Sequence, residues 1–182
     1  MLHYIHDNSA HEGAGINTMS NVSACVLAQN IIRNNAASGS GGGVYIEQGN
    51  YGHALMGNTI SNNTSGDCGG GIHIHSYEGN HLLAGNVISD NIAGSVGGGI
   101  SLYQTSGNTL DSNVVTGNTA HANGGAIWMY DASYNTLSNN RICLNHTMDV
   151  GTGGVYVDAG ASGTTWLTLA GDPVAGIYNV IS

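Results

Sequence analysis

The chain contains no lysine and no phenylalanine, a single proline, and only two arginines, Arg33 and Arg141. Charged residues make up 7 % of the 182 residues, and the formal net charge is −9. A surface that binds nucleic acid or an anionic membrane needs clustered basic side chains to neutralise phosphate groups. Two arginines cannot supply such a cluster, so the composition excludes both of these partners.

Long apolar runs are also missing. No run approaches the ~18 residues of a membrane span, and the first residues lack the basic-then-apolar pattern of a signal peptide. We therefore expect no membrane insertion and a mature or excised chain. The three cysteines, Cys25, Cys68 and Cys143, lack metal-ligand spacing, and their odd number argues against a disulfide framework. We expect free, partly buried thiols.

Glycine is abundant, with 30 residues, and hydrophobic residues make up 41 % of the chain. This mixture favours short strands joined by tight turns. A glycine-rich segment recurs six times, beginning at residues 13, 41, 69, 97, 124 and 152 and reading GAGINT, GGGVYI, GGGIHI, GGGISL, GGAIWM and TGGVYV. The spacing of 27 or 28 residues predicts a solenoid whose repeats stack on one another.

A second signature runs in register with the first. Two asparagines recur five residues apart in each repeat, at Asn30, Asn58, Asn86, Asn113 and Asn140, and at Asn35, Asn63, Asn91, Asn118 and Asn145. Stacked repeats lie about 4.8 Å apart, so identical side chains can hydrogen-bond along the stack. Both columns are therefore expected to be structural.

Each repeat is predicted to hold three short strands. Alternation in GGGIHIHSY (69–77) directs Ile72 and Ile74 inward, and Leu82 and Ile88 should complete the inward face of that repeat. One repeat cannot bury this face alone, so we expect its neighbours to bury it by stacking.

The segments GGGISLYQTSGNTLDSNVVTGN (97–118) and GGAIWMYDASYNTLSNNRICLN (124–145) resemble the repeats of the right-handed parallel β-helix family of carbohydrate-binding proteins and sugar hydrolases, the pectate-lyase-like superfamily. The resemblance covers roughly residues 3–165. It implies an all-β, single-domain, right-handed parallel β-helix of about six rungs over residues 1–182. Because this family contains lyases, hydrolases, epimerases, copper-site maturation proteins and adhesins, it implies little about chemistry.

If Ile72 and Ile74 point inward, His73 and His75 point outward. The equivalent outward pairs on successive rungs are Asn17/Met19, Tyr45/Glu47, His73/His75, Ser101/Tyr103, Trp128/Tyr130 and Tyr156/Asp158. In the family this face commonly forms the floor of a saccharide groove. Aromatic rings suit the apolar faces of sugars, and tyrosine, histidine and carboxylate suit their hydroxyls. We therefore expect substrate binding by Tyr45, Trp128, Tyr130, Asp131, Tyr156 and Asp158. The alternative is an aromatic ladder that only stiffens the sheet.

Two chemical roles remain open for this face. His75 and Tyr103 form the best acid–base pair, with His73 and Glu47 beside them as further catalytic candidates. His73, His75 and Glu47 could instead hold a divalent cation, the one cofactor that these residues suggest. The uronate-lyase pattern of the family does not carry over, because Arg33 and Arg141 lie on the third strand. The carboxylates Glu47 and Asp158 lie four rungs, or about 19 Å, apart, beyond the ~5–9.5 Å of a glycosidase pair.

Another outward column is expected on the second strand, where Cys25, His53, His81 and Thr109 follow one another. Cys25 and His53 would lie about one rung apart, within reach of a thiol–imidazole pair, although coincidence is the simpler interpretation. The remaining histidines, His3, His6, His11, His121 and His146, are interpreted as surface residues.

The register slips between Thr165 and Asn179, and the final NVIS (179–182) copies residues 86–89. No helical cap is evident, so we expect an excised segment of a longer protein and possible partners at open strand edges, including self-association. The sequence favours a secreted or cell-surface module that binds or processes a polysaccharide. The alternatives are a non-catalytic structural or adhesive repeat, and a metal-binding module.

Overall fold

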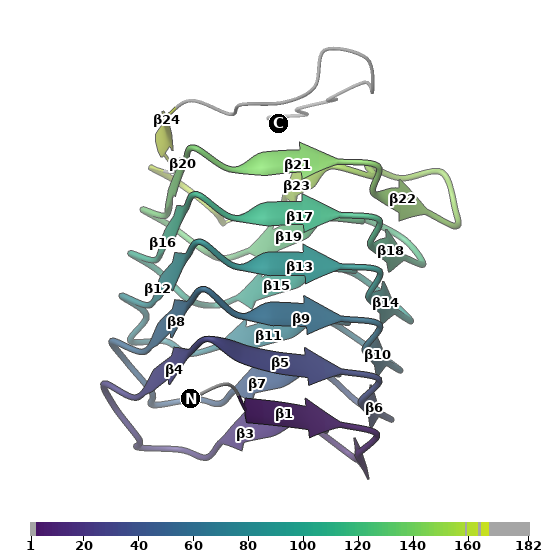
Figure 1. The fold of residues 1–182 in the computed structure, drawn as a ribbon. Coiled ribbons are helices and arrows are strands. Elements are labelled where there is room, and N and C mark those ends of the chain that lie inside the picture. The colour runs from purple at the N-terminus through teal and green to yellow at the C-terminus, as the bar shows by residue number, and fades with distance from the viewer. Residues whose placement is uncertain (1–2, 159, 164, 168–182) are drawn as a thin grey trace.

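The computed structural model describes residues 3–158, 160–163 and 165–167. They form short parallel strands that stack as a solenoid of about six turns, with no helix. In Figure 1 the chain runs from left to right along the front, returns from right to left along the back, and rises with each turn. This sense of winding is right-handed, and the predicted all-β parallel β-helix is confirmed.

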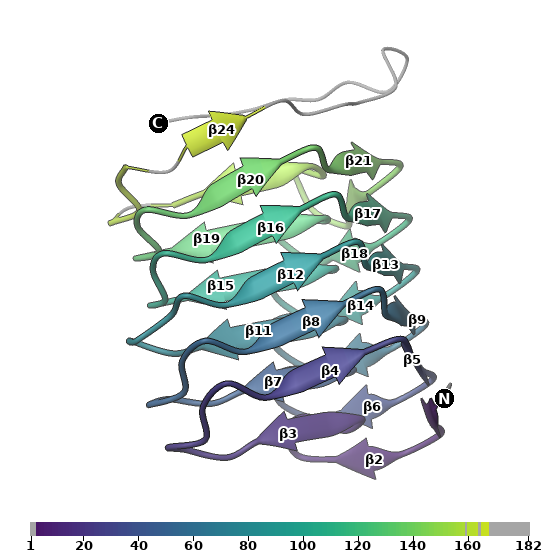
Figure 2. The ribbon, with the colours of Figure 1, turned by 60° about the vertical axis from the view of Figure 1, so that its left-hand side comes forward.

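Each turn contains four strands, one more than the three predicted. The strands align in four six-stranded parallel sheets, here called the first to fourth sheets in the order in which the chain enters them after each glycine segment. The first sheet contains β3 (Ile16–Thr18), β7 (Val44–Ile46), β11 (Ile72–His75), β15 (Ile100–Tyr103), β19 (Ile127–Tyr130) and β23 (Val155–Val157). The second sheet, in the foreground of Figure 2, contains β4 (Val26–Ala28), β8 (Ala54–Met56), β12 (Leu82–Ala84), β16 (Thr109–Asp111), β20 (Thr136–Ser138) and β24 (Thr165–Leu167).

The third sheet contains β1 (His3–His6), β5 (Asn30–Arg33), β9 (Thr59–Ser61), β13 (Val87–Ser89), β17 (Val114–Thr116) and β21 (Arg141–Cys143). The fourth sheet, which the repeat pattern did not predict, contains the two-residue strands β2 (Ser9–Ala10), β6 (Ala36–Ala37), β10 (Thr64–Ser65), β14 (Ile92–Ala93), β18 (Thr119–Ala120) and β22 (His146–Thr147). Two residues are too short for an alternating pattern to reveal.

The core is a continuous column of aliphatic side chains inside the coil. Ile72, Ile74 and Ile88 are fully buried there, as predicted. The prediction for the second strand is wrong by one residue, because Leu83 is fully buried and Leu82 faces outward, half-buried.

The register of the first sheet follows the predicted repeat. His73 pairs with Tyr45 on the rung below and with Ser101 on the rung above, and Ser101 pairs in turn with Trp128. A one-residue slip would move every apolar side chain from the core to the surface. The buried isoleucines therefore fix the register that aligns the outward residues.

Both predicted asparagine columns are hydrogen-bonded ladders. In the first, the backbone and side-chain N–H groups of Asn58 donate to Asn86 Oδ1 at 2.9 and 3.0 Å, and Asn86 Nδ2 donates to Leu55 O at 2.8 Å. Asn35, Asn63 and Asn91 form the same contacts in the second. Each of these asparagine side chains thus hydrogen-bonds buried backbone N–H or C=O groups at the corner where the chain turns between two strands.

The register slip expected after Thr165 and the final segment at 179–182 lie outside the described residues. No stretch of the described chain forms a helix that is long and apolar enough to cross a membrane.

Candidate functional site: the aromatic ladder of the first sheet

The glycine segment before each strand of the first sheet lies directly against that strand. Gly69 has a φ of +64°, and a Cβ atom there would lie 2.4 Å from the Ile72 carbonyl oxygen and 2.8 Å from the His73 Cα atom. Any larger residue would clash, so glycine is needed for the turn to fold back so closely. This close approach places the turn against the backbone at the start of the strand.

His73 faces outward, as predicted, but it is not on an exposed surface. Its exposed fraction is 5 %, its Nδ1 atom lies 3.0 Å from Ser101 Oγ, and its ring stacks on Tyr45 with centroids 5.2 Å apart. Burial, together with the nearby His75, lowers the pKa of His73 to about 3. The expectation of an exposed His73 is therefore wrong, because Tyr45, Ser101 and His75 lie against its ring.

His75, two residues later, is half-buried and lies beside two tyrosines. Its ring meets Tyr103 edge-to-face at a centroid distance of 4.7 Å and Tyr77 in the same manner at 5.6 Å. Gln48 Nε2 lies 3.0 Å from His75 Nε2 and 3.5 Å from the Tyr77 hydroxyl. Burial lowers the pKa of His75, so the neutral ring accepts the Gln48 N–H. The pattern of outward pairs did not predict Gln48 or Tyr77. Gln48 follows the predicted pair Tyr45/Glu47, and Tyr77 follows the predicted pair His73/His75.

Glu47 is directed toward the rung below. Its Oε2 atom accepts the backbone N–H of Ser20 at 2.7 Å and the Ser20 hydroxyl at 2.9 Å. In the described part of the chain, no three His, Cys, Asp or Glu side chains come together as a metal-binding group. The structure thus does not assemble His73, His75 and Glu47 around one ion.

Above His75, three aromatic rings stack on one another, with Tyr103 on one rung and Trp128 and Tyr130 together on the next rung. Tyr103 and Tyr130 have centroids 5.5 Å apart, Trp128 and Tyr130 5.7 Å, and Tyr103 and Trp128 6.2 Å, with interplanar angles of 7–14°. Trp128 is buried, Tyr103 half-buried and Tyr130 exposed. We call His75, Tyr77, Tyr103, Trp128 and Tyr130 the aromatic ladder. Parallel rings turn their edges and hydroxyls outward, so the ladder presents both apolar and polar groups.

The other predicted binding residues lie around the ladder. Tyr45 is buried below it, where burial raises the pKa of its hydroxyl to about 12. Tyr156 pairs with Trp128 from the rung above and is half-buried. Asp131 is exposed directly after β19, and the half-buried Asp158 donates its backbone N–H to Met129 O at 2.8 Å. The structure thus places Tyr156 next to the ladder and the two carboxylates at strand ends.

In the column that begins at Cys25, His53 and His81 are buried in the interior, not outside as expected. The backbone N–H of Cys25 donates to His53 Nδ1 at 3.0 Å, that of His53 to His81 Nδ1 at 3.1 Å, and that of His81 to Asn108 Oδ1 at 3.0 Å. The fourth member is therefore Asn108, because Thr109 pairs with Leu82. This column is a third ladder in which imidazole replaces the asparagine amide.

These contacts fix the protonation of both interior histidines. Because Nδ1 accepts a backbone N–H, the single proton of each neutral ring is on Nε2. His81 Nε2 lies 3.2 Å from Ser76 Oγ, whereas His53 Nε2 is the one buried side-chain nitrogen or oxygen that lacks a partner among the described residues. Burial lowers the pKa of His53, and burial with the nearby His53 lowers that of His81 to about 4. Neither ring can act as a base without breaking the ladder.

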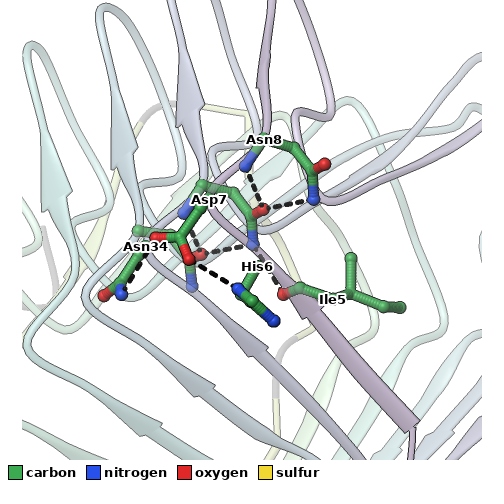
Figure 3. Close-up of polar contacts among 7 residues, drawn as sticks. Ile5, His6, Asp7, Asn8 and Asn34 are labelled. Carbon is green, nitrogen blue, oxygen red and sulfur yellow. Dashed lines mark hydrogen bonds and ion pairs between the residues drawn. The ribbon is translucent and has the colours of Figure 1, made fainter.

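The first rung carries a separate polar group, shown in Figure 3. His6 Nδ1 lies 2.5 Å from Asp7 Oδ2, and Asn34 Nδ2 donates to Asp7 Oδ1 at 3.3 Å. Both members of the His6–Asp7 pair are exposed. The contacts hold the corner after β1, where Asp7 adopts a φ of +57°.

Comparison with known proteins gives one family. A family model described as "Periplasmic copper-binding protein (NosD)" matches residues 1–166. No curated protein and no solved structure matches the chain significantly.

Proposed function

The chain belongs to the NosD family of periplasmic copper-binding proteins, and we propose that it is an extracytoplasmic β-helix module that binds a neutral glycan on its aromatic ladder. The observation that carries this proposal is the continuous contact of His75, Tyr103, Trp128 and Tyr130 on one outward face. The ladder runs across the rungs, so a bound glycan chain would lie along the axis of the solenoid.

The chemistry of the ladder suits a sugar polymer. The outward ring edges offer apolar atoms to the C–H groups of a sugar, while the tyrosine hydroxyls and the His75–Gln48 pair offer hydrogen bonds to its hydroxyls. Glu47 and Asp131 flank this face, and the chain has no lysine. An acidic polysaccharide would meet like charge there, which favours a neutral ligand. Binding without cleavage is the simpler function, because His73 is buried and Glu47 is engaged with Ser20.

The copper in the family description does not fit the interior histidines. His53 and His81 carry their protons on Nε2, and their Nδ1 atoms accept backbone N–H groups, so no lone pair is free for a metal. The Cys68 thiol is equally unsuited, because burial and the adjacent Asp67 raise its pKa to about 12 and keep it protonated.

Affinity electrophoresis in gels that contain neutral or uronate polysaccharides tests the proposal. We expect retardation by a neutral glycan and at least a tenfold weaker interaction for the double variant Tyr103→Ala/Tyr130→Ala. Tyr4→Ala is the matched control, because Tyr4 is an exposed tyrosine on β1 in the third sheet. Retention unchanged in the double variant, or none by any polysaccharide, would contradict glycan binding and favour a structural repeat. New reducing ends that disappear in His75→Ala would establish cleavage in addition.

A further inference from the structure

The aromatic ladder brings the indole of Trp128 into contact with two phenol rings. The Trp128 centroid lies 6.2 Å from that of Tyr103 and 5.7 Å from that of Tyr130, and the two tyrosine centroids lie 5.5 Å apart. The rings of all three pairs are nearly parallel. Indole and phenol are the aromatic side chains that lose one electron most readily, and near-parallel rings in contact exchange an electron quickly. The three rings therefore form a continuous path for an electron.

The three rings differ in their access to water. The exposed fraction is 8 % for Trp128 and 36 % for Tyr130, and Tyr103 is half-buried. When a phenol loses an electron, its hydroxyl becomes a very strong acid and its proton leaves, so water must be at hand to take that proton. Of the two phenols, Tyr130 meets this requirement better. Oxidation of any ring in the stack should therefore end at Tyr130.

The rings below the stack do not offer a second way out. His75 contacts Tyr103 at a centroid distance of 4.7 Å, and His73 lies between His75 and Tyr45 at 6.3 and 5.2 Å. A neutral imidazole is harder to oxidise than a phenol or an indole, so the two histidines interrupt the path. Tyr45 beyond them is buried, and burial raises the pKa of its hydroxyl to about 12. Its proton has no acceptor in water.

We propose that Trp128, Tyr103 and Tyr130 form an electron relay that carries a one-electron oxidation from the buried indole to the exposed phenol. A small oxidising radical takes one electron from the indole and leaves a radical cation. Tyr130 returns one electron to the indole, directly or through Tyr103, and releases its hydroxyl proton to water. The net products are the reduced oxidant, an intact indole, the neutral Tyr130 phenoxyl radical and one proton.

The relay would protect the interior of the first sheet. Permanent oxidation of Trp128 would add oxygen to a ring that is packed against two others. A phenoxyl radical at the surface is instead restored when a dissolved reductant donates a hydrogen atom to its oxygen. This function does not depend on glycan binding, and its test uses the chain without polysaccharide.

Pulse radiolysis with the azide radical, a one-electron oxidant that attacks indole faster than phenol at neutral pH, tests the relay. The full chain would carry Trp166→Phe, which leaves Trp128 as the one tryptophan. We expect the absorption of the tryptophanyl radical to decay as that of the tyrosyl radical rises, at a rate that is independent of protein concentration. The double variant Tyr103→Phe/Tyr130→Phe keeps the rings and removes the hydroxyls, and it should slow this conversion at least tenfold.

Tyr134→Phe is the matched control, because Tyr134 is an exposed tyrosine outside the ladder; it should leave the rate unchanged. Four outcomes would overturn the relay. They are no tryptophanyl signal, a rate proportional to protein concentration, an unchanged rate in the double variant, and an equal loss in Tyr134→Phe.

A second measurement uses the unmodified chain. Without a reductant, two Tyr130 phenoxyl radicals from different chains should couple through one carbon–carbon bond between their rings and form dityrosine, each having already lost one electron and one proton. Peptide mapping by mass spectrometry should locate this cross-link at Tyr130. Tyr4, Tyr51, Tyr77 and Tyr134 are all more exposed. A cross-link confined to these four would show that exposure alone directs the oxidation, and would refute the relay.

Discussion

Two interior ladders provide hydrogen-bond acceptors for buried backbone N–H groups, one with asparagine side chains and the other with histidine side chains. In the column of Asn30, Asn58, Asn86, Asn113 and Asn140, each amide above Asn30 accepts from the rung below, and every amide donates from its own nitrogen. In the neighbouring column, His53 and His81 accept a backbone N–H equally well, and their rings stack with centroids 5.2 Å apart. Their remaining nitrogens, however, require a separate partner, which His81 has in Ser76 and His53 lacks among the described residues.

The difference shows that the fold requires an acceptor at this corner more strictly than it requires asparagine. An amide is neutral at every pH, whereas a buried imidazole is destabilised by its own protonation. The asparagine ladder should therefore supply stability that is independent of pH, and the histidine ladder should make the same solenoid sensitive to acid.

The largest effect is expected when the asparagine ladder is interrupted. Asn86→Ala removes the acceptor of two Asn58 N–H groups and the donor to Leu55 O. With each unpaired buried group costing about 1–3 kcal/mol, the free energy of unfolding should fall by about 5 kcal/mol, measured by urea denaturation at pH 7.5. Asn17→Ala, an exposed position on β3, should cost less than about 0.5 kcal/mol. A small loss in Asn86→Ala would show that water replaces the ladder.

The free energy of unfolding should decrease in acid because His73 and His81 are buried as neutral rings. The folded-state pKa values of His73 and His81 are about 3 and about 4, below the ordinary value of 6.5. Below pH 6.5 the unfolded chain therefore binds more protons than the folded chain, and stability falls as pH decreases from about 6.5 toward these values. For the two residues together the loss from pH 7.5 to pH 5 should be about 4 kcal/mol. Equal denaturant midpoints at the two pH values would contradict their burial as neutral rings.

The smallest effect on stability is expected when the histidines of the second column are replaced by asparagine. The double variant His53→Asn/His81→Asn restores an amide acceptor for each backbone N–H, so stability at pH 7.5 should change by only about 1 kcal/mol. The acid sensitivity between pH 7.5 and 5 should fall by about half, because His73 remains. His81→Ala, which supplies no acceptor for His53, should cost about 2–3 kcal/mol. A double variant as unstable as the alanine variant would mean that ring packing, not the acceptor, stabilises this column.

Much of the fold could be predicted because the same repeat occurs six times in the sequence. The spacing of 27 or 28 residues is sufficient to align His73 with Tyr45 and Ser101, and both asparagine ladders follow from the same spacing. The two-residue strands of the fourth sheet did not follow, and neither did the inward direction of Leu83. Short strands and turns of variable length carry no periodic signal of their own.

The candidate site could be predicted only as a set of aligned positions. The sequence placed His75, Tyr103 and Tyr130 in one column, and the structure brings their rings into contact. The burial of His73 depends on Tyr45 and Ser101 on the adjacent rungs, and the direction of Glu47 depends on Ser20 one rung below. Such contacts join residues that are far apart in the sequence, and their side-chain directions are chosen by packing.

The sequence by itself determined the coil, its register and its core, because hydrophobic alternation and identical repeats allow only one way to stack. Only the tertiary structure decided which outward side chains are exposed to solvent and which are buried. It also decided which histidine ring nitrogens have a lone pair that is not already used in a hydrogen bond. These properties depend on what lies one rung above and below and on how each turn folds back, and so they emerge only when the rungs are in contact.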